Sequence, residues 1–598
     1  MKKALLLAAV LLFPISLHAQ YWADYVLEKG FNPRDYFLRS HRVLSLNLKN
    51  QDSGLLGILP DPLSEMSFQP AALSSITGTR LYIDLKGSSS KEAEFKNRVY
   101  PTYFYDNARF APSYWAQPVE RKLEPLVSAI YIGDLAAKYL PGWKFAISYE
   151  LIHHEGTFYE YVPYWYWGGY DAFGARAEDS NRFPEIDPAI KQDGLDQKSE
   201  TAHMVDGHLS MRLASFLSVG AKVSRVQTDM DGDYLRLNNY DYQGDYNYRS
   251  RYLNLKNSGA SLRQNEASAG ALFTLGETRH IGFFAGVIDG DHRQSAVDAD
   301  SSFYSYGENP QAEYYSRSRY SHLSDSYWRH EGTTRYAGVH GQLPMQNNIA
   351  FRFRFEYQKS SIDLSNGSTV SDTSFYFYRF RYYDDNVIYN SIGSSRFTEQ
   401  RVGNGDENRT VKTAAAGLVV PMYRQSQITV GVFAETMKSD AIIYEDAQVY
   451  RSSNQESPTP WRPVERMVGI EDKTLRLDQH QKLTRLALPI AMNFYVGRGW
   501  TLNLAAVKSY QKIESDEIID IWYRTDSTVV ITPDSVTPQN PPQRIDRYIS
   551  VPVRNGESTT DFRFGVTFEP SRRVRFDVGM GTSPTELEDW QFAVALSL

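Results

Sequence analysis

Apolar and polar residues alternate with a period of two along most of this chain. The clearest stretch is 349–358, where one set of alternate positions is apolar or aromatic: Ile349, Phe351, Phe353, Phe355 and Tyr357. The positions between them hold Ala350, Arg352, Arg354, Glu356 and Gln358. Successive side chains of a β-strand point to opposite faces, so this period predicts a strand with one apolar face.

The same alternation recurs at intervals through the chain. It appears in 80–86, 143–151, 217–224, 428–434, 486–494, 500–506, 562–568, 574–580 and 590–598. Many positions opposite the apolar face hold Gly, Ala or Ser, which suits a lumen or a tightly packed interior. We therefore expect the apolar faces to point outward, into lipid.

Short turns and long polar stretches alternate between these strands. We expect turns near 138–142, 215, 276–279, 344–348, 423–427, 496–499 and 569–573. We expect the polar stretches to be loops, at roughly 87–125, 153–205, 227–266, 289–333, 360–411, 437–483 and 511–560. This alternation is typical of outer-membrane barrels, with short turns in the periplasm and long loops outside the cell. A soluble all-β domain would need several structureless loops of about forty residues, which compact domains rarely contain.

The predicted fold is all-β, a transmembrane antiparallel β-barrel of about sixteen strands over 80–598. Aromatic residues stand at strand ends, where the membrane interface favours them: Trp143, Phe494, Trp500 and Trp590. The chain ends on an alternating strand whose last residue is Leu598. Such a strand is similar to the signal read by barrel-assembly machinery, although Phe is the usual last residue. Outer-membrane lipid and that machinery are the partners that the fold implies.

The first residues have the order of a secretory signal peptide. Lys2 and Lys3 precede an apolar run over 4–13, Pro14 interrupts it, and Ala19 places a small residue before a cleavage point. The run is too short to cross a bilayer as a helix. We expect 1–19 to be removed on export, and both ends of the mature chain to lie in the periplasm.

Composition excludes several kinds of site. The 598 residues include no cysteine, which rules out disulfides and thiolate metal ligands. The net charge of −7 argues against a nucleic-acid partner, which would need a basic surface. Asp229, Asp231 and Asp233 lack the Gly and Glu of a calcium loop, and the adjacent His153 and His154 would face opposite ways on a strand.

Motifs of common enzymes are missing from the sequence. Neither a Gly-x-Ser-x-Gly elbow nor a His-Glu-x-x-His motif occurs. An outer-membrane hydrolase that assembles its site from scattered loop residues is the alternative. We expect no metal site, no cofactor and no enzymatic activity.

Residues 20–79 do not alternate and form a distinct N-terminal segment. They contain a glycine-bounded run at 54–57, the pair Asp61-Pro62, and the run Phe-Gln-Pro-Ala-Ala-Leu at 68–73 just before the first strand. A glycine-containing run, an Asp-Pro pair and an Asn-Pro-Ala-x-Leu motif in these places resemble the FadL-type barrels. That family includes hydrophobic-substrate transporters and PorV-like secretion components. The resemblance covers about 54–86, and Gln69 stands where the family usually has Asn.

The resemblance implies fourteen strands, fewer than the alternation predicts, and an N-terminal segment folded into the lumen as a hatch. By that similarity, residues 20–79 are a candidate plug. The alternative is a periplasmic segment that precedes the barrel. The aromatic and leucine content of the segment argues against full disorder.

Two groups of residues are candidates for ligand contact. The first is a group of charged side chains expected to face the lumen: Arg352, Arg354, Glu356 and Lys222. Such charges tune selectivity in porins but also form ion-pair ladders that fill a barrel. The second is an aromatic group in the second long stretch: Tyr164, Trp165, Tyr166 and Trp167. Those rings would contact a ligand or partner, or pack among the loops and the aromatic girdle.

These observations predict an outer-membrane barrel that mediates the passage of small hydrophobic molecules across the outer membrane. The substrate class comes from the FadL-type resemblance, not from composition or spacing. The alternative is a non-transporting barrel whose long tyrosine-rich loops bind a secretion or surface protein, or serve in assembly.

Overall fold

The structure is a computed structural model, and it describes the residues given in the next sentence. These are 37, 57–59, 61–88, 93–98, 113–118, 127–135, 142–157, 197–243, 247–276, 279–307, 313–381, 388–423, 425–456, 464–539, 545–549, 553–583 and 586–598. The expected signal peptide, 1–19, lies outside them.

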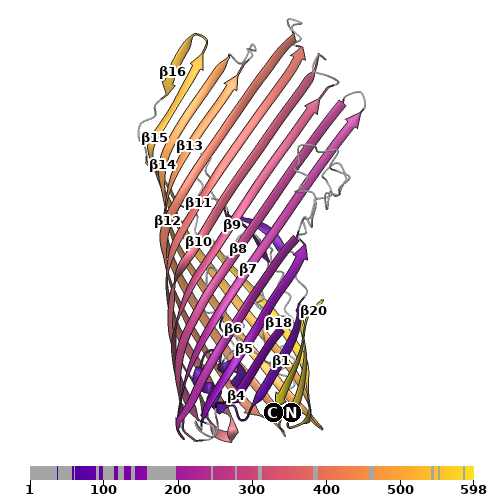
Figure 1. The fold of residues 1–598 in the computed structure, drawn as a ribbon, viewed down its shortest axis with the longest axis vertical. Coiled ribbons are helices and arrows are strands. Elements are labelled where there is room, and N and C mark those ends of the chain that lie inside the picture. Colours follow the sequence, from indigo (N-terminus) through magenta and orange to yellow (C-terminus); the bar gives the residue numbers. More distant parts are fainter. Residues whose placement is uncertain are drawn as a thin grey trace.

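The described strands form one large antiparallel sheet that closes into a barrel (Figure 1). Sixteen strands make the wall. They are β1 (Arg80–Ser88), β4 (Val127–Asp134), β5 (Trp143–Thr157), β6 (Gln197–Ala214), β7 (Leu217–Gln243), β8 (Asn247–Thr274), β9 (His280–Tyr306), β10 (Tyr315–Pro344), β11 (Ala350–Arg381), β12 (Ile388–Pro421), β13 (Gln427–Gln455), β14 (Glu465–Gly497), β15 (Trp500–Thr532), β18 (Val553–Ser571), β19 (Val574–Ser583) and β20 (Glu586–Ser597). The expected all-β transmembrane barrel of about sixteen strands is confirmed.

Four further strands lie outside this count. β16 (Ser535–Gln539) and β17 (Ile545–Ile549) pair with the second half of β15. β2 (Ala93–Arg98) and β3 (Ser113–Pro118) form a separate two-stranded sheet. The described residues contain no helix both long and apolar enough to cross a bilayer.

The barrel closes at β1, which pairs with the last strand on one side and with β4 on the other. Arg80 lies opposite both Ser597 of β20 and Ile132 of β4. Closure removes the unpaired edges that an open sheet would present to lipid. Strands β1, β4, β19 and β20 are short, whereas β7–β15 rise well above them in Figure 1.

The short turns fall where the sequence predicts them. β6 ends at Ala214 and β7 begins at Leu217, and the other short connections between the wall strands follow the same plan. The turn between β14 and β15 is built from Gly497, Arg498 and Gly499, with φ values of 122°, 51° and 83°. Two glycines allow this run of left-handed backbone, which L side chains seldom adopt.

The expected long loops from residue 227 onward are wrong over most of their length, because the strands continue through them. The expected loops 87–125 and 153–205 lie largely outside the described residues. The stretch 227–266 belongs to β7 and β8 except for a three-residue gap in the described chain, and 437–483 belongs largely to β13 and β14. Asp229, Asp231 and Asp233 therefore lie on a strand. Asp, Ser and Asn residues interrupt the apolar positions of these stretches, so no regular apolar face marks the strands there. Backbone pairing does not need such a face.

The outer face carries an apolar band in the part of each strand next to the short turns. On β14, Leu486 and Leu488 are 46% and 57% exposed, whereas the alternate Ala487 is 2% exposed. Ile83 of β1 and Val432 of β13 are likewise exposed, at 40% and 46%. Exposed apolar side chains repeated around a closed barrel form a surface suited to lipid acyl chains.

A charge placed in this band is expected to destabilise the barrel, and the cost should depend on depth. For Val432→Arg we expect the free energy of unfolding in phospholipid vesicles to fall by about 2–4 kcal/mol. Ile442→Arg is the control, on the same outer face of β13 but farther from the short turn, and we expect a loss below about 1 kcal/mol. Denaturant titration measures both. Equal losses would show that the apolar band is not where lipid contacts the protein.

Candidate functional site

Residues 57–59 and 61–76, here called the luminal segment, lie inside the barrel at the level of the apolar band. The segment contains the four-residue helix α2 (Pro62–Glu65) and the 3-10 helix η3 (Pro70–Ser75), drawn in indigo at the lower end of the barrel in Figure 1. Each helix begins with a proline, whose fixed φ suits a first helical position and whose missing N–H leaves no unpaired donor there. Nearly the whole segment is buried.

The luminal segment satisfies much of its own polar chemistry. Asp61 caps α2, accepting hydrogen bonds from the backbone N–H of Leu63 at 3.3 Å and from the hydroxyl of Ser64. The hydroxyls of Ser67 and Ser74 donate to backbone carbonyls three residues earlier, at 2.7 and 2.8 Å. A segment with its polar groups paired internally can be buried at modest cost.

Arg352 of β11 joins the barrel wall to the luminal segment. Its guanidinium donates to the carbonyl of Gly57 at 3.1 Å and forms an ion pair with Glu65. A third contact, 3.0 Å long, goes to the side-chain amide oxygen of Gln342 on β10. The side chains of Arg352 and Glu65 are 4% and 11% exposed, so the pair is shielded from water.

Lys222 of β7 makes a second joint. Its ammonium donates to the carbonyls of Ser67 at 3.0 Å and Phe37 at 3.3 Å. The same nitrogen lies 2.8 Å from Glu266 of β8, and both side chains are almost fully buried. The hydroxyl of Tyr336 on β10 also donates to Glu266, so this carboxylate links side chains of β7 and β10.

Arg354 packs its guanidinium over the ring of Phe68, 4.7 Å from the ring centroid. This cation–π contact is buried, where such contacts are strongest. Glu356 pairs with Arg354 at 2.5 Å and accepts a hydrogen bond from Gln358 at 3.1 Å. Phe68 also meets the ring of His340 edge-on, with centroids 5.1 Å apart.

Gln69 and a nearby glycine fix how closely the segment approaches the wall. The Gln69 amide donates to the backbone carbonyls of Ala271 on β8 and Phe283 on β9, at 3.0 and 3.1 Å. A Cβ on Gly220 of β7 would lie 2.5 Å from the carbonyl carbon of Pro70 and 2.6 Å from the nitrogen of Ala71. Since those atoms are backbone, any side chain at 220 would displace the segment.

Apolar packing completes the seat of the luminal segment. Leu63, Met66, Leu73 and Ile76 pack with inward residues of the strands around the barrel closure, β1, β4, β5 and β18–β20, here called the closing side. These inward residues are Tyr82, Ile130, Ile132, Ala146 and Ala593. Ile58 packs on the opposite side with Ala415, Phe433, Ala487, Ala491 and Val507. The segment thus contacts the wall on both sides of the lumen.

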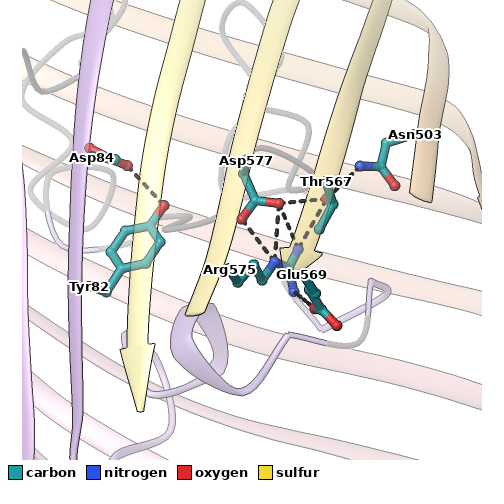
Figure 2. A network of polar contacts seen from close by, with 7 residues as sticks. All are labelled: Tyr82, Asp84, Asn503, Thr567, Glu569, Arg575 and Asp577. Atoms are coloured by element: carbon teal, nitrogen blue, oxygen red, sulfur yellow. Dashed lines mark hydrogen bonds and ion pairs between the residues drawn. The ribbon is translucent and has the colours of Figure 1, made fainter. Parts of the chain in front are cut away.

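Polar side chains on the closing side pair with one another (Figure 2). Arg575 and Asp577 of β19 form an ion pair of 2.9 Å, and Thr567 of β18 donates to Asp577 at 2.5 Å. Tyr82 donates to Asp84 at 3.1 Å on β1. These contacts satisfy polar groups that face the interior, as burial requires.

Farther from the short turns, the interior changes character. A buried apolar cluster spans six strands from β8 to β15, here called the upper apolar cluster: Leu262, Trp328, Ile362, Leu364, Ala441, Ile443, Ala447, Leu475, Leu477, Ile519, Ile521 and Tyr523. Ile443 is 3% exposed, while its neighbours Ile442 and Tyr444 are 40% and 44% exposed, so Ile443 faces inward. Inward charges near this level pair along their own strand, as Lys473 does with Glu471 at 2.6 Å.

The structure brings together all four predicted luminal residues. Lys222, Arg352 and Arg354 contact residue 37 or the luminal segment, and Glu356 holds Arg354. Their predicted role as ligand contacts stays a prediction. Glu65, Gln69 and Gly220 were missed, and the small inward residues of β7–β9 were the signal that could have located them.

The predicted aromatic loop group, Tyr164, Trp165, Tyr166 and Trp167, lies outside the described residues. Within the described ranges, no group of three or more His, Asp or Glu side chains is placed to hold a metal ion.

Comparison with known proteins supplies no family for this chain. No family model matches the chain, and no curated protein sequence matches it. A Pseudomonas aeruginosa FadL homologue has 10% identity and a TM-score of 0.30, with 91% of this chain and 96% of that chain covered. The P. putida toluene transporter TodX has 10% identity and a TM-score of 0.32, with 93% and 98% covered. The P. aeruginosa ferric enterobactin receptor has 7% identity and a TM-score of 0.26, with 88% and 81% covered.

An even number of antiparallel strands, closed and banded with apolar residues on the outside, is the architecture of a bacterial outer-membrane protein. The similarity scores are too low to indicate a function.

Removing the Arg352 charge should loosen the luminal segment. Arg352→Met leaves Glu65 buried without its partner, which costs about 3–5 kcal/mol. We expect amide hydrogen exchange over 61–76 to accelerate about a hundredfold or more. Adding Glu65→Gln to the same chain should restore part of the protection. Arg409→Met, which breaks a buried pair with Glu407 on β12, is the control and should leave exchange over 61–76 unchanged. Equal acceleration in both variants would contradict a holding role for Arg352.

Proposed function

We propose that this barrel mediates the passage of small hydrophobic molecules across the outer membrane, and that the luminal segment is a hatch that closes it. The observation that carries the substrate class is the upper apolar cluster. A water-filled porin lines its interior with polar side chains. Here twelve buried residues facing the interior are apolar or aromatic. Such a lining favours an apolar solute over an ion.

The contacts of the luminal segment support a hatch. The polar contacts to the wall are non-covalent: Arg352 of β11 and Lys222 of β7 bond to the segment, and Gln69 of the segment bonds to β8 and β9. Such joints can be broken together and remade. The segment itself keeps its internal hydrogen bonds, so it can move as a unit without exposing unpaired backbone groups.

In this proposal the long strands and their connections lie outside the cell, and both ends of the mature chain lie in the periplasm. A hydrophobic molecule reaches the upper apolar cluster first and meets the luminal segment at the depth of the apolar band. Movement of the segment then connects the interior to the periplasm. Residues 1–19 act as the signal peptide and 20–79 as the hatch domain.

A side chain at residue 220 should open the hatch without altering the rest of the wall. For Gly220→Val in a planar bilayer, we expect steady ion conductance where the unaltered chain is silent, since the new Cβ collides with the backbone at Pro70 and Ala71. Gly207→Val is the matched control. A Cβ at 207 makes an ordinary contact with Val223 at 3.6 Å, so we expect it to remain silent.

Conductance in the unaltered chain would contradict the hatch and indicate an open pore. Silence in Gly220→Val would contradict passage through the lumen. That result would favour the second candidate, a barrel whose outer connections bind a secretion or surface protein.

Polar substitution in the upper apolar cluster should separate hydrophobic passage from ion flow. We expect Leu477→Asn with Ile521→Asn to slow uptake of N-phenyl-1-naphthylamine by cells expressing the barrel, by about tenfold for a loss of about 1–2 kcal/mol of apolar contact. The same pair of changes in the Gly220→Val background should leave ion conductance within about twofold of that background. Unchanged dye uptake would contradict a hydrophobic route through this cluster.

A further inference from the structure

Five exposed basic side chains, here called the basic row, lie at the edge of the apolar band on five neighbouring strands. They are Arg335 on β10, Lys359 on β11, Lys412 on β12, Lys438 on β13 and Lys482 on β14. All five point outward. On β11, for example, Lys359 follows the outward Phe355 and Tyr357, which are 49% and 47% exposed, in strict alternation.

The strand register places these charges next to one another. Arg335 lies directly opposite Lys359, and Lys438 lies directly opposite Lys482. Lys412 links the two pairs diagonally, because Lys359 faces Thr410 and Lys412 faces Thr436. Directly opposed residues have Cβ atoms about 5 Å apart and diagonal neighbours about 7–8 Å apart. The basic row is therefore continuous across the wall that Figure 1 shows from β10 to β14.

Like charges directly opposed on neighbouring strands destabilise a sheet unless an opposite charge lies between them. Within the described part of the chain, Lys359, Lys412 and Lys438 have no carboxylate partner, and Lys482 reaches Glu514 at 3.4 Å. Basic residues farther from the short turns are paired: Arg476 with Asp478 at 2.9 Å, Arg524 with Asp446 at 2.8 Å and Arg547 with Asp520 at 2.6 Å. These three pairs are neutralised, whereas three adjacent members of the basic row are not.

The position of the basic row relative to the apolar band indicates which anion would supply the missing negative charge. Apolar outward residues occupy each strand on one side of the row. On the other side come outward carboxylates, including Asp363 and Asp406, which face each other across β11 and β12. The row therefore lies where acyl chains give way to lipid headgroups. Lipid phosphates occupy this depth, and basic side chains there attract them.

We propose that the basic row binds the phosphates of a lipid A headgroup in the leaflet next to the long strands. A lipid with two phosphates can neutralise opposed pairs on both halves of the row at once. Its acyl chains then cover the outward apolar residues below, such as Phe355 and Tyr357. This site lies on the outside of the wall and does not depend on the proposed passage through the lumen.

The test is a titration of the full-length barrel in detergent with lipid A, read by native mass spectrometry, with phosphatidylethanolamine as the reference lipid. The variant is Lys359→Gln, Lys412→Gln and Lys438→Gln together. We expect affinity for lipid A to fall about fivefold for each lysine removed, hence about a hundredfold in all. The matched control removes the same charge from paired residues: Arg476→Gln, Arg524→Gln and Arg547→Gln. We expect its affinity to stay within about twofold of the unaltered chain.

A third variant, Lys359→Arg, Lys412→Arg and Lys438→Arg together, keeps the charge and should keep the affinity. In the unaltered chain, affinity for lipid A should fall as salt rises. The affinity of the arginine variant and the salt dependence of the unaltered chain test the proposed lipid A site even where the glutamine variant does not fold. Equal losses in the two glutamine variants, or no preference for lipid A over phosphatidylethanolamine, would overturn the proposal.

Discussion

A backbone amide inside a bilayer has no water to bond, so each strand of this protein needs a partner on both sides. The pairing of β1 with β20 and β4 meets that requirement for the whole sheet, because it joins residues from the two ends of the barrel-forming chain. An outer band of apolar side chains is stable only on a sheet closed in this way. The enclosed space that holds the luminal segment exists for the same reason.

Alternate residues of each strand face the interior and the exterior of the barrel, and charged side chains are neutralised differently on the two faces. Inward charges such as Arg354 and Glu356 neutralise each other within two residues of one strand, so they can be buried. Outward charges are left to water or to lipid headgroups. The luminal segment is buried among these inward charges. Asp61, Ser67 and Ser74 bond to the backbone of the segment itself, so those backbone groups need no partner from the wall.

Periodicity predicted the barrel, the turns and the inward direction of Arg352 and Lys222, because lipid on one side forces a strict apolar face. It failed where lipid ends. Beyond the apolar band, the inward Ile362 and Leu364 of β11 stand among polar neighbours, so no regular apolar face marks the strand. The ladder of backbone hydrogen bonds between β11 and β12 leaves no mark in composition. The partners within the site were equally hidden. Glu65 and Arg352 are 287 positions apart in sequence, and only barrel closure makes them neighbours.

The fourteen strands implied by family resemblance and the sixteen in the structure differ by one hairpin. The resemblance lay in a short segment before the first strand, which says how a lumen is filled but not how wide it is. Counting turns was the better guide because each turn is a local feature, set by residues such as Gly497 and Gly499 that the backbone geometry requires.

The connection between η3 and β1 limits how far the proposed hatch can move. η3 ends at Ser75 and β1 begins at Arg80, so four residues join this helix to the strand that closes the barrel. Fully extended, they span at most about 14 Å. A displaced segment would thus stay at an effective concentration of millimolar or more beside its seat, and reclosing would be an intramolecular step. Opening would be a limited movement about the four-residue connection, and its equilibrium would not depend on the concentration of the protein in the membrane.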